Sequence, residues 1–279
     1  MTSSFFTLPF FVEEKDGLLF SFQNSPFGFS SLRVFSFGHD AFFLSYSFSD
    51  GRSFSLLIDP FKLSQDKLSE LNFFKVDLLL ITHNHFDHFD PDSLKLLFDN
   101  GFLSSDSVVV APLECSNGLS SFSFKEVNLL KPGDSFSLPL SLGFSFLIKG
   151  LPAYNVNKFR DPVNKVVFHP KSDGKLGFFF SLSCDEGFSL SAYHTGDSDF
   201  IPEMKMISEK IDLFFVPVSG TYVMTVDEAF EAVLALKPNF VIPMHYGVIV
   251  GSRDDALRLK ELLSSNDVSD LKTKVFVIY

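Results

Sequence analysis

Three histidines and two aspartates are concentrated in one ten-residue stretch, ITHNHFDHFD, at 81–90. Four of them have the spacing H-x-H-x-D-H, namely His83, His85, Asp87 and His88. Imidazoles suit zinc and other borderline transition metals, and a carboxylate adds a hard, negative ligand. Because the turn follows a largely apolar segment at 76–81, we expect His83 and His85 to approach one ion and Asp87 and His88 to face a second.

A polar surface turn, or a structural metal clip, is the alternative interpretation of this stretch. Structural zinc sites usually contain cysteine and are coordinatively closed. The two cysteines of the chain, Cys115 and Cys184, lie outside the histidine turn. The motif therefore favours a catalytic type of metal site.

Two later segments offer further ligands at the ends of predicted strands. Asp197 follows a glycine in YHTGDSDF, at 193–200, where a carboxylate could bridge two ions. His245 ends an apolar stretch in VIPMHYG, at 241–247. Either residue alone would more often be a cap or a surface group, so the prediction rests on their combination with the histidine turn.

The segments that must position these residues are mostly strand-like. Apolar and β-branched runs bounded by turn residues predict strands, and the unbroken apolar run predicts a strand buried on both faces. The expected strands cover 32–37, 41–48, 53–58, 76–81, 107–111, 126–130, 135–148, 176–183, 188–194, 240–243 and 274–278.

Helices are expected between some of these strands. A weakly helical stretch lies near 64–71, and PDSLKLLFDNG, at 91–101, has proline at its start and glycine past its end. Thr225 and Glu228 form a capping box before another helix, and a last helix is expected at 253–264. Hairpins followed by strands alternating with helices predict sheets covered by helices, in a single domain at 1–279.

Seven segments together resemble the metallo-β-lactamase superfamily, and more closely its branch containing the ascorbate-6-phosphate lactonases and many uncharacterised metal-dependent hydrolases. They are GHDAFFL (38–44), LIDPF (57–61), THNHFDH (82–88), PAYN (152–155), YHTGDSDFIPEM (193–204), VPVSGTYVM (216–224) and IPMHYG (242–247). The resemblance runs from about residue 30 to residue 250. It implies an α/β (α+β) fold, a four-layer αββα sandwich with the metal centre at one edge.

The resemblance also implies a ligand set. The first ion would be bound by His83 and His85, the second by Asp87, His88 and His245, and Asp197 would bridge the two. The family usually supplies a further first-site histidine from the segment that here reads PAYNVNKF, where Asn155 stands instead. We favour His169, in FHPK, as that ligand, with Asn155 beside the centre. If neither residue binds, a one-metal enzyme becomes plausible.

Two divalent ions, zinc or manganese, would make hydrolysis the natural chemistry, because the pKa of bound water can fall to roughly 7. Asp87 is a candidate to orient the resulting hydroxide. Candidates to protonate the leaving group are His194, His169 and Tyr246. His194 is equally a candidate to orient a metal ligand, and His39 is interpreted as a structural histidine.

Candidate substrate-binding residues come from two segments. A basic stretch, with Lys158, Arg160, Lys165 and Lys171, is either a solvated loop or an anion-binding element. SGTYVM, at 219–224, resembles a loop beside the metals. The predicted substrate contacts are Asn155, Lys158, Arg160, Thr221, Tyr222 and Tyr246.

Composition limits the partners. The net charge of −11 and the pI near 5.0 oppose nucleic-acid binding, which depends largely on counterion release. No apolar stretch approaches the ~18 residues that span a bilayer, and the N-terminus lacks the basic start of a secretory signal. We therefore expect a cytoplasmic protein with a small-molecule substrate. The sequence leaves open whether it forms a homo-oligomer.

Three hypotheses follow from different classes. The first is a hydrolase for a small anionic ester, lactone or phosphoester. The second is a phosphodiesterase or nuclease on the same fold, which the acidic charge disfavours, and the third is a non-catalytic metal-binding protein. A di-iron redox role is weakened because residue 85 is histidine where the related di-iron oxidases typically place a carboxylate.

Overall fold

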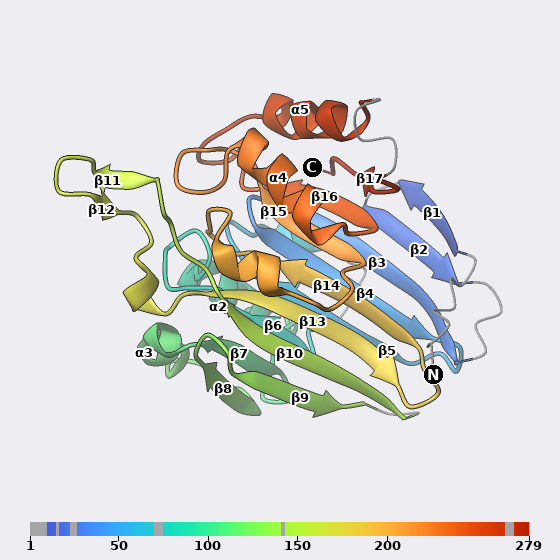
Figure 1. The fold of residues 1–279 in the computed structure, drawn as a ribbon. Helices are drawn as coiled ribbons and strands as arrows, with labels where there is room; N and C mark the ends of the chain where they lie inside the picture. Colours follow the sequence, from blue (N-terminus) through green and yellow to red (C-terminus); the bar gives the residue numbers. More distant parts are fainter. Residues whose placement is uncertain are drawn as a thin grey trace.

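Two β-sheets packed face to face form the centre of the molecule, and helices cover their outer faces (Figure 1). The computed structural model describes residues 10–14, 17–22, 27–69, 75–140, 143–265 and 271–278. The four-layer αββα arrangement expected from the sequence is confirmed.

The first sheet has eight described strands that lie in chain order. The strands from β1 to β5 pair antiparallel, and those from β5 to β8 pair parallel. Their bounds are β1 Phe10–Glu14, β2 Leu18–Phe22, β3 Phe29–Gly38, β4 Ala41–Phe48, β5 Ser53–Ile58, β6 Leu78–Leu80, β7 Val108–Pro112 and β8 Glu126–Leu130.

The second sheet has seven described strands in the order β17-β16-β15-β14-β13-β10-β9. The strands from β14 to β17 are parallel, and the others are antiparallel. Their bounds are β9 Ser135–Pro139, β10 Phe144–Pro152, β13 Leu176–Cys184, β14 Ser189–His194, β15 Leu213–Pro217, β16 Phe240–Met244 and β17 Lys274–Val275.

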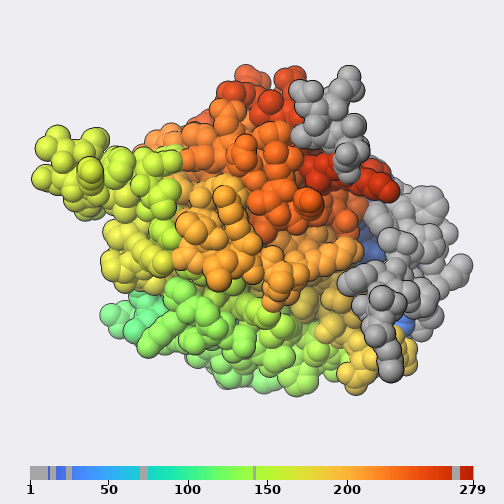
Figure 2. Space-filling model, viewed as in Figure 1, coloured from blue at the N-terminus to red at the C-terminus, as the bar shows by residue number. Residues whose placement is uncertain are grey.

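A short two-stranded ribbon stands apart from both sheets. It consists of β11 (Phe159–Asp161) and β12 (Val166–Val167), and it projects from the body of the molecule (Figures 1 and 2). The helices are α1 Gln65–Ser69, α2 Pro91–Asp99, α3 Ser116–Leu119, α4 Val226–Leu236 and α5 Arg253–Leu263, with 3₁₀ turns at Leu113–Cys115, Lys171–Asp173 and Pro202–Met206. None of the described helices is long and apolar enough to span a membrane.

Alternation along the strands produces three apolar layers. In β15, Leu213 and Phe215 face the interior between the sheets, while Phe214 and Val216 face outward. The outward residues pack in one cluster with buried residues of α4 and α5, and the outer face of the first sheet packs in the same way with α1 and α2. Because both faces are covered, β15 reads in sequence as a continuous apolar run.

Several predicted elements agree with the structure. The bounds of β4, β5 and β8 are those predicted, and the capping box of Thr225 and Glu228 opens α4. Of the predicted helix at 64–71, the described part is α1, and residues 70 and 71 lie outside the described residues.

Other predicted elements are wrong. The single strand predicted at 135–148 is a hairpin, because the chain turns after Pro139 and Gly143 takes a positive φ of 71° that favours glycine. The strand predicted at 274–278 pairs only over Lys274–Val275. Strands β1, β2, β11, β12 and β15 were not predicted.

The interior between the sheets depends on large aromatic side chains. Phe146 is fully buried there, and its ring lies 5.0 Å from that of Phe54 and 5.6 Å from that of Tyr46. We expect Phe146→Ala to lower the free energy of unfolding by about 3–5 kcal/mol, because it leaves a cavity. Urea unfolding measures this. Val163→Ala, at a residue that is 90% exposed, should change it by less than about 0.5 kcal/mol; equal effects would contradict the assigned core.

Candidate metal centre

All seven histidines of the chain lie at one edge of the sandwich. Six of them lie at strand ends or in the turns that follow: His39 after β3, the three histidines of the 83–88 turn after β6, His194 at the end of β14, and His245 after β16. Parallel strands within each sheet present their carboxyl ends at this edge, as ligand-binding α/β sheets do. The fold therefore gathers residues that are more than 200 positions apart in the sequence.

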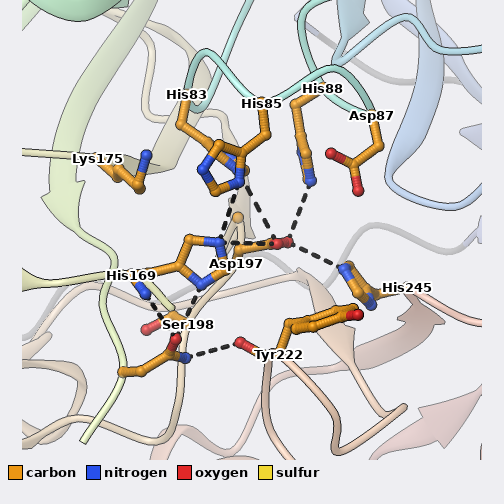
Figure 3. A network of polar contacts seen from close by, with 12 residues as sticks. His83, His85, Asp87, His88, His169, Lys175, Asp197, Ser198, Tyr222 and His245 are labelled. Carbon is orange, nitrogen blue, oxygen red and sulfur yellow. Dashed lines mark hydrogen bonds and ion pairs between the residues drawn. The ribbon is translucent and has the colours of Figure 1, made fainter. Parts of the chain in front are cut away.

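Asp197 lies between two groups of imidazoles (Figure 3). Its Oδ2 atom is 3.9 Å from Nε2 of His83 and 3.4 Å from Nε2 of His169. Its Oδ1 atom is 3.3 Å from Nε2 of His88 and 3.4 Å from Nε2 of His245. Each carboxylate oxygen thus faces a different group.

The first group contains only imidazoles. His83, His85 and His169 offer nitrogen atoms that all lie within 4.8 Å of one another, and His85 Nδ1 is 3.3 Å from His169 Nε2. The structure therefore brings His169 to the place that the sequence analysis favoured for it. Asn155 contacts the other ring nitrogen of His169, Nδ1.

The second group is richer in carboxylates. His88 and His245 share it with Asp197 and Asp40, and a partly overlapping set joins the same two histidines to His39 and Asp87. Asp87 Oδ2 accepts a hydrogen bond from His39 Nε2 at 3.1 Å. His39, interpreted from sequence as structural, therefore contacts a predicted ligand directly.

The chemistry of these groups fits divalent cations. Buried atoms without a hydrogen-bond partner in the described part of the chain include Nε2 of His83, His88 and His245, both oxygens of Asp40, and Oδ1 of Asp197. Buried polar atoms are normally paired, so a cluster of unpaired nitrogens and oxygens calls for an explanation. Bound metal ions would satisfy these atoms, since each of them can donate a lone pair.

Asp59 fixes the orientation of two of these histidines. The residue follows β5, and its Oδ2 accepts a hydrogen bond from His88 Nδ1 at 2.8 Å and from Thr82 Oγ1 at 2.6 Å. Thr82 Oγ1 in turn accepts from His83 Nδ1 at 3.0 Å. Both Nδ1 atoms are therefore protonated, which leaves the Nε2 lone pairs for a cation.

The other two strand-end ligands are held in the same way. Asn155 Oδ1 accepts from the ring Nδ1 of His169 and from its backbone N–H, both at 2.9 Å. His245 Nδ1 lies 2.9 Å from Ser219 Oγ. A partner on the far nitrogen of a histidine fixes the ring and raises its basicity as a ligand. Asn155 is thus placed to position His169 rather than to bind.

Close backbone approach sets the position of Asp197. A side chain at Gly196 would place its Cβ 2.7 Å from the carbonyl oxygen of Leu176 and 3.2 Å from Thr82. Gly196 also has a positive φ of 58°. Glycine is needed here because only it permits the second sheet to approach the turn after β6 this closely.

Burial and charge shift the pKa values of the site residues in opposite directions. Burial lowers the pKa of His169 to about 4. The pKa of His245 is raised to about 9, because the charges of Asp197 and Asp40 outweigh the opposing effect of burial. Asp197 is buried too, but His245 and His88 hold its pKa well below the usual value. A cation that binds the second group therefore has to displace protons.

His194 and Tyr246, predicted as catalytic or substrate-binding residues, make hydrogen bonds to backbone groups instead. His194 uses both ring nitrogens on backbone groups: Nε2 lies 3.2 Å from the carbonyl oxygen of Asp40, and Nδ1 accepts from the N–H of Gly196. This geometry favours the orienting role over proton transfer. Tyr246 packs in the outer core, and its hydroxyl donates to the carbonyl of Ile278.

The residues predicted to bind an anionic substrate do not lie together at the centre. Lys158 is buried and paired with Glu228 at 2.7 Å and Asp199 at 3.3 Å, so its charge is neutralised. Arg160 lies exposed on the projecting ribbon, and Thr221 is exposed. Tyr222 lies near His245 in Figure 3, and its backbone oxygen accepts from Asn155.

Sequence reasoning missed three residues of the site. Asp40 and Asp59 stand within GHDAFFL and LIDPF, but their roles depend on contacts across the fold. Lys175 lies just beyond the basic stretch. It is buried, and its Nζ atom is 3.3 Å from Glu114 Oε1. The pKa values of His85 and His169 are lowered mainly by burial, and the charge of Lys175 lowers them further.

A model of the β-lactamase superfamily domain matches residues 33–245, more than half of the chain. The chain belongs to the metallo-β-lactamase superfamily. Like its relatives, it is a metal-dependent hydrolase of this superfamily. It is 30% identical, over 247 residues, to a UPF0173 metal-dependent hydrolase of Thermofilum pendens, a match that covers 86% of this chain and 93% of the relative.

Solved structures show the same superfamily fold. A protein of Parabacteroides distasonis described as a metal-dependent hydrolase is 26% identical with a TM-score of 0.63, over 97% of this chain and 100% of that one. Igni18, a metallo hydrolase of Ignicoccus hospitalis, is 25% identical with a TM-score of 0.62, over 88% and 94%. None of these three names gives a substrate, so the lactonase branch stays a prediction.

The role assigned to Asn155 predicts a selective loss of metal affinity. Asn155→Ala should weaken binding to the first group by roughly 10–100-fold, because His169 loses the partner that orients it. Competition with a chromophoric chelator measures the affinity. Asn164→Ala, on the projecting ribbon, is the matched control and should bind as the unmodified chain does. Equal affinity in the two variants would contradict the orienting role.

Proposed function

We propose that this hydrolase uses two divalent ions, held on either side of Asp197, to hydrolyse a small anionic ester, lactone or phosphoester. The observation that carries the proposal is the position of the Asp197 carboxylate. One of its oxygens lies within 4 Å of two imidazole nitrogens of the first group, and the other lies within 4 Å of two imidazole nitrogens of the second. A buried carboxylate between two sets of lone pairs suits a bridge between cations. Zinc suits the imidazole group, and manganese is the second candidate.

The ions, when bound, supply hydroxide at neutral pH and polarise the attacked oxygen. The protein groups set the geometry. Asp59, Thr82 and Asn155 hold the histidine rings, and His39 holds the carboxylate of Asp87 through one oxygen. The other oxygen of Asp87 is left to orient the attacking water. Rigid positioning of this kind lowers the reorganisation needed in the transition state.

The preference for an anionic substrate rests on Lys175. With Lys158 neutralised by Glu228 and Asp199, Lys175 is the cation that acts on the first group, where its charge reaches His85 and His169. Its Nζ atom lies 3.3 Å from one carboxylate oxygen, Oε1 of Glu114, whereas Lys158 is paired with two carboxylates. A buried lysine beside the centre would stabilise a negative group on the substrate. The net charge of −11 supports a small molecule rather than a nucleic acid as substrate.

Metal content and turnover test the proposal together. The unmodified chain should bind roughly two equivalents of zinc or manganese and turn over at least one member of a panel of lactones, phosphodiesters and thioesters. Asp197→Ala and His85→Ala should each abolish turnover. Asp185→Ala, at an exposed turn residue, should leave it unchanged. Turnover retained after either site substitution would count against the mechanism, and activity confined to phosphodiesters would favour the phosphodiesterase alternative.

The role of Lys175 makes a separate prediction. Lys175→Gln should lower kcat/KM for an anionic substrate by roughly tenfold or more, since a hydrogen bond to a charged group contributes about 1.5–3 kcal/mol. A neutral analogue of that substrate should be affected much less. Lys165→Gln, at an exposed lysine of the predicted basic stretch, is the matched control. A larger effect from Lys165→Gln would return the anion-binding role to that stretch.

A further inference from the structure

Asp40 is a buried carboxylate that the metal scheme so far does not use. Its side chain is fully inaccessible, and neither of its oxygens has a hydrogen-bond partner among the described residues. Its Oδ2 lies 3.7 Å from Nε2 of His88. Together with His88, Asp197 and His245, it offers ligand atoms that lie within 4.8 Å of one another.

Two hydrogen bonds connect the backbone of the turn between β3 and β4 to the second sheet. The N–H of His245 donates to the carbonyl oxygen of His39 at 3.2 Å. His194 Nε2 lies 3.2 Å from the carbonyl oxygen of Asp40 and, because its Nδ1 accepts from Gly196, donates to it. His39 and His245 both take positive φ values, 56° and 59°. Such conformations cost free energy and persist where the surrounding structure holds them.

Two histidines and a second carboxylate surround Asp40. The carboxylates of Asp40 and Asp197 belong to one group, whose ligand atoms all lie within 4.8 Å of one another. Isolated buried charges are costly unless they are paired or bind a metal. Among the described residues, the cationic partners of Asp40 are His88 and His245, whose Nε2 atoms already face Asp197 and have no hydrogen-bond partner of their own.

We propose that Asp40 is an additional ligand of the second ion, and that it makes the two metal positions chemically unequal. The inference rests on the two-ion function proposed above. The first position then has three imidazoles and one oxygen of Asp197. The second has two imidazoles and the carboxylates of Asp40, Asp87 and Asp197.

This inequality predicts a difference in metal preference. Imidazole ligands suit zinc, whereas carboxylates suit harder ions such as manganese. The second position should therefore accept manganese more readily than the first. The charges agree with this assignment, because two divalent ions are balanced by three carboxylates and one anionic nucleophile.

Metal titration of the metal-free chain tests the inference without measuring activity. The unmodified chain should bind two manganese or two zinc ions. Asp40→Asn, which keeps the shape but removes the charge, should weaken the second equivalent by roughly tenfold or more and leave the first equivalent unchanged. The loss should be larger for manganese than for zinc. Asp50→Asn, in the exposed turn after β4, is the matched control and should bind as the unmodified chain does.

Thermal unfolding separates a ligand from a structural residue. In metal-free protein, Asp40→Asn should leave the melting temperature nearly unchanged, because the amide keeps the shape of the carboxyl group. With saturating metal, the same substitution should lower it, because a ligand is lost. A residue with only a structural role would shift the melting temperature in the same direction under both conditions.

The outcomes distinguish this inference from the function on which it rests. If the unmodified chain binds two ions and Asp40→Asn binds both with equal affinity, Asp40 is not a ligand and the two-ion hydrolase stands. If the unmodified chain binds a single ion, both proposals are overturned. Loss of the first equivalent in Asp40→Asn, or a shift of the same sign with and without metal, would also overturn the assignment of Asp40.

Discussion

The structure depends on a buried carboxylate that lies between two sets of imidazoles. Asp197 comes directly after β14, and its two oxygens face His83 and His169 on one side and His88 and His245 on the other. Without a metal ion, its buried charge depends on His245 and His88, which hold its pKa well below the usual value. The fold around it is organised to bring these groups to one edge at the same time.

That requirement explains local features that would otherwise be unfavourable. Gly196 lets the turn after β14 pass close to the turn after β6, where a Cβ would collide with the backbone of Leu176 and crowd Thr82. His39, Asp59 and His245 all adopt positive φ, which few residues other than glycine do. Each of them lies at a strand end that supplies a ligand or the partner of one. Backbone strain is therefore concentrated where the chain must turn sharply to reach the centre.

The sequence predicted the parts of this site that are local in the chain. The histidine turn could be recognised because its four ligands lie within six residues. Asp197 and His245 were proposed from their places at predicted strand ends, and the resemblance to a known superfamily assigned them to the two ions. Asp40, Asp59 and Lys175 could not be recognised, because a carboxylate or a lysine becomes part of the centre only through contacts with distant strands. The same limit applies to the fold: the turn that splits 135–148 into β9 and β10 depends on pairing that a short apolar pattern does not specify.

The central claim is that two cations share Asp197. Anomalous diffraction from crystals grown with zinc, recorded on both sides of the zinc absorption edge, tests it most directly. The account predicts two zinc peaks on opposite sides of the Asp197 carboxylate, each about 2.0–2.2 Å from one of its oxygens. A single peak, or two peaks that both lie beyond the reach of Asp197, would contradict it.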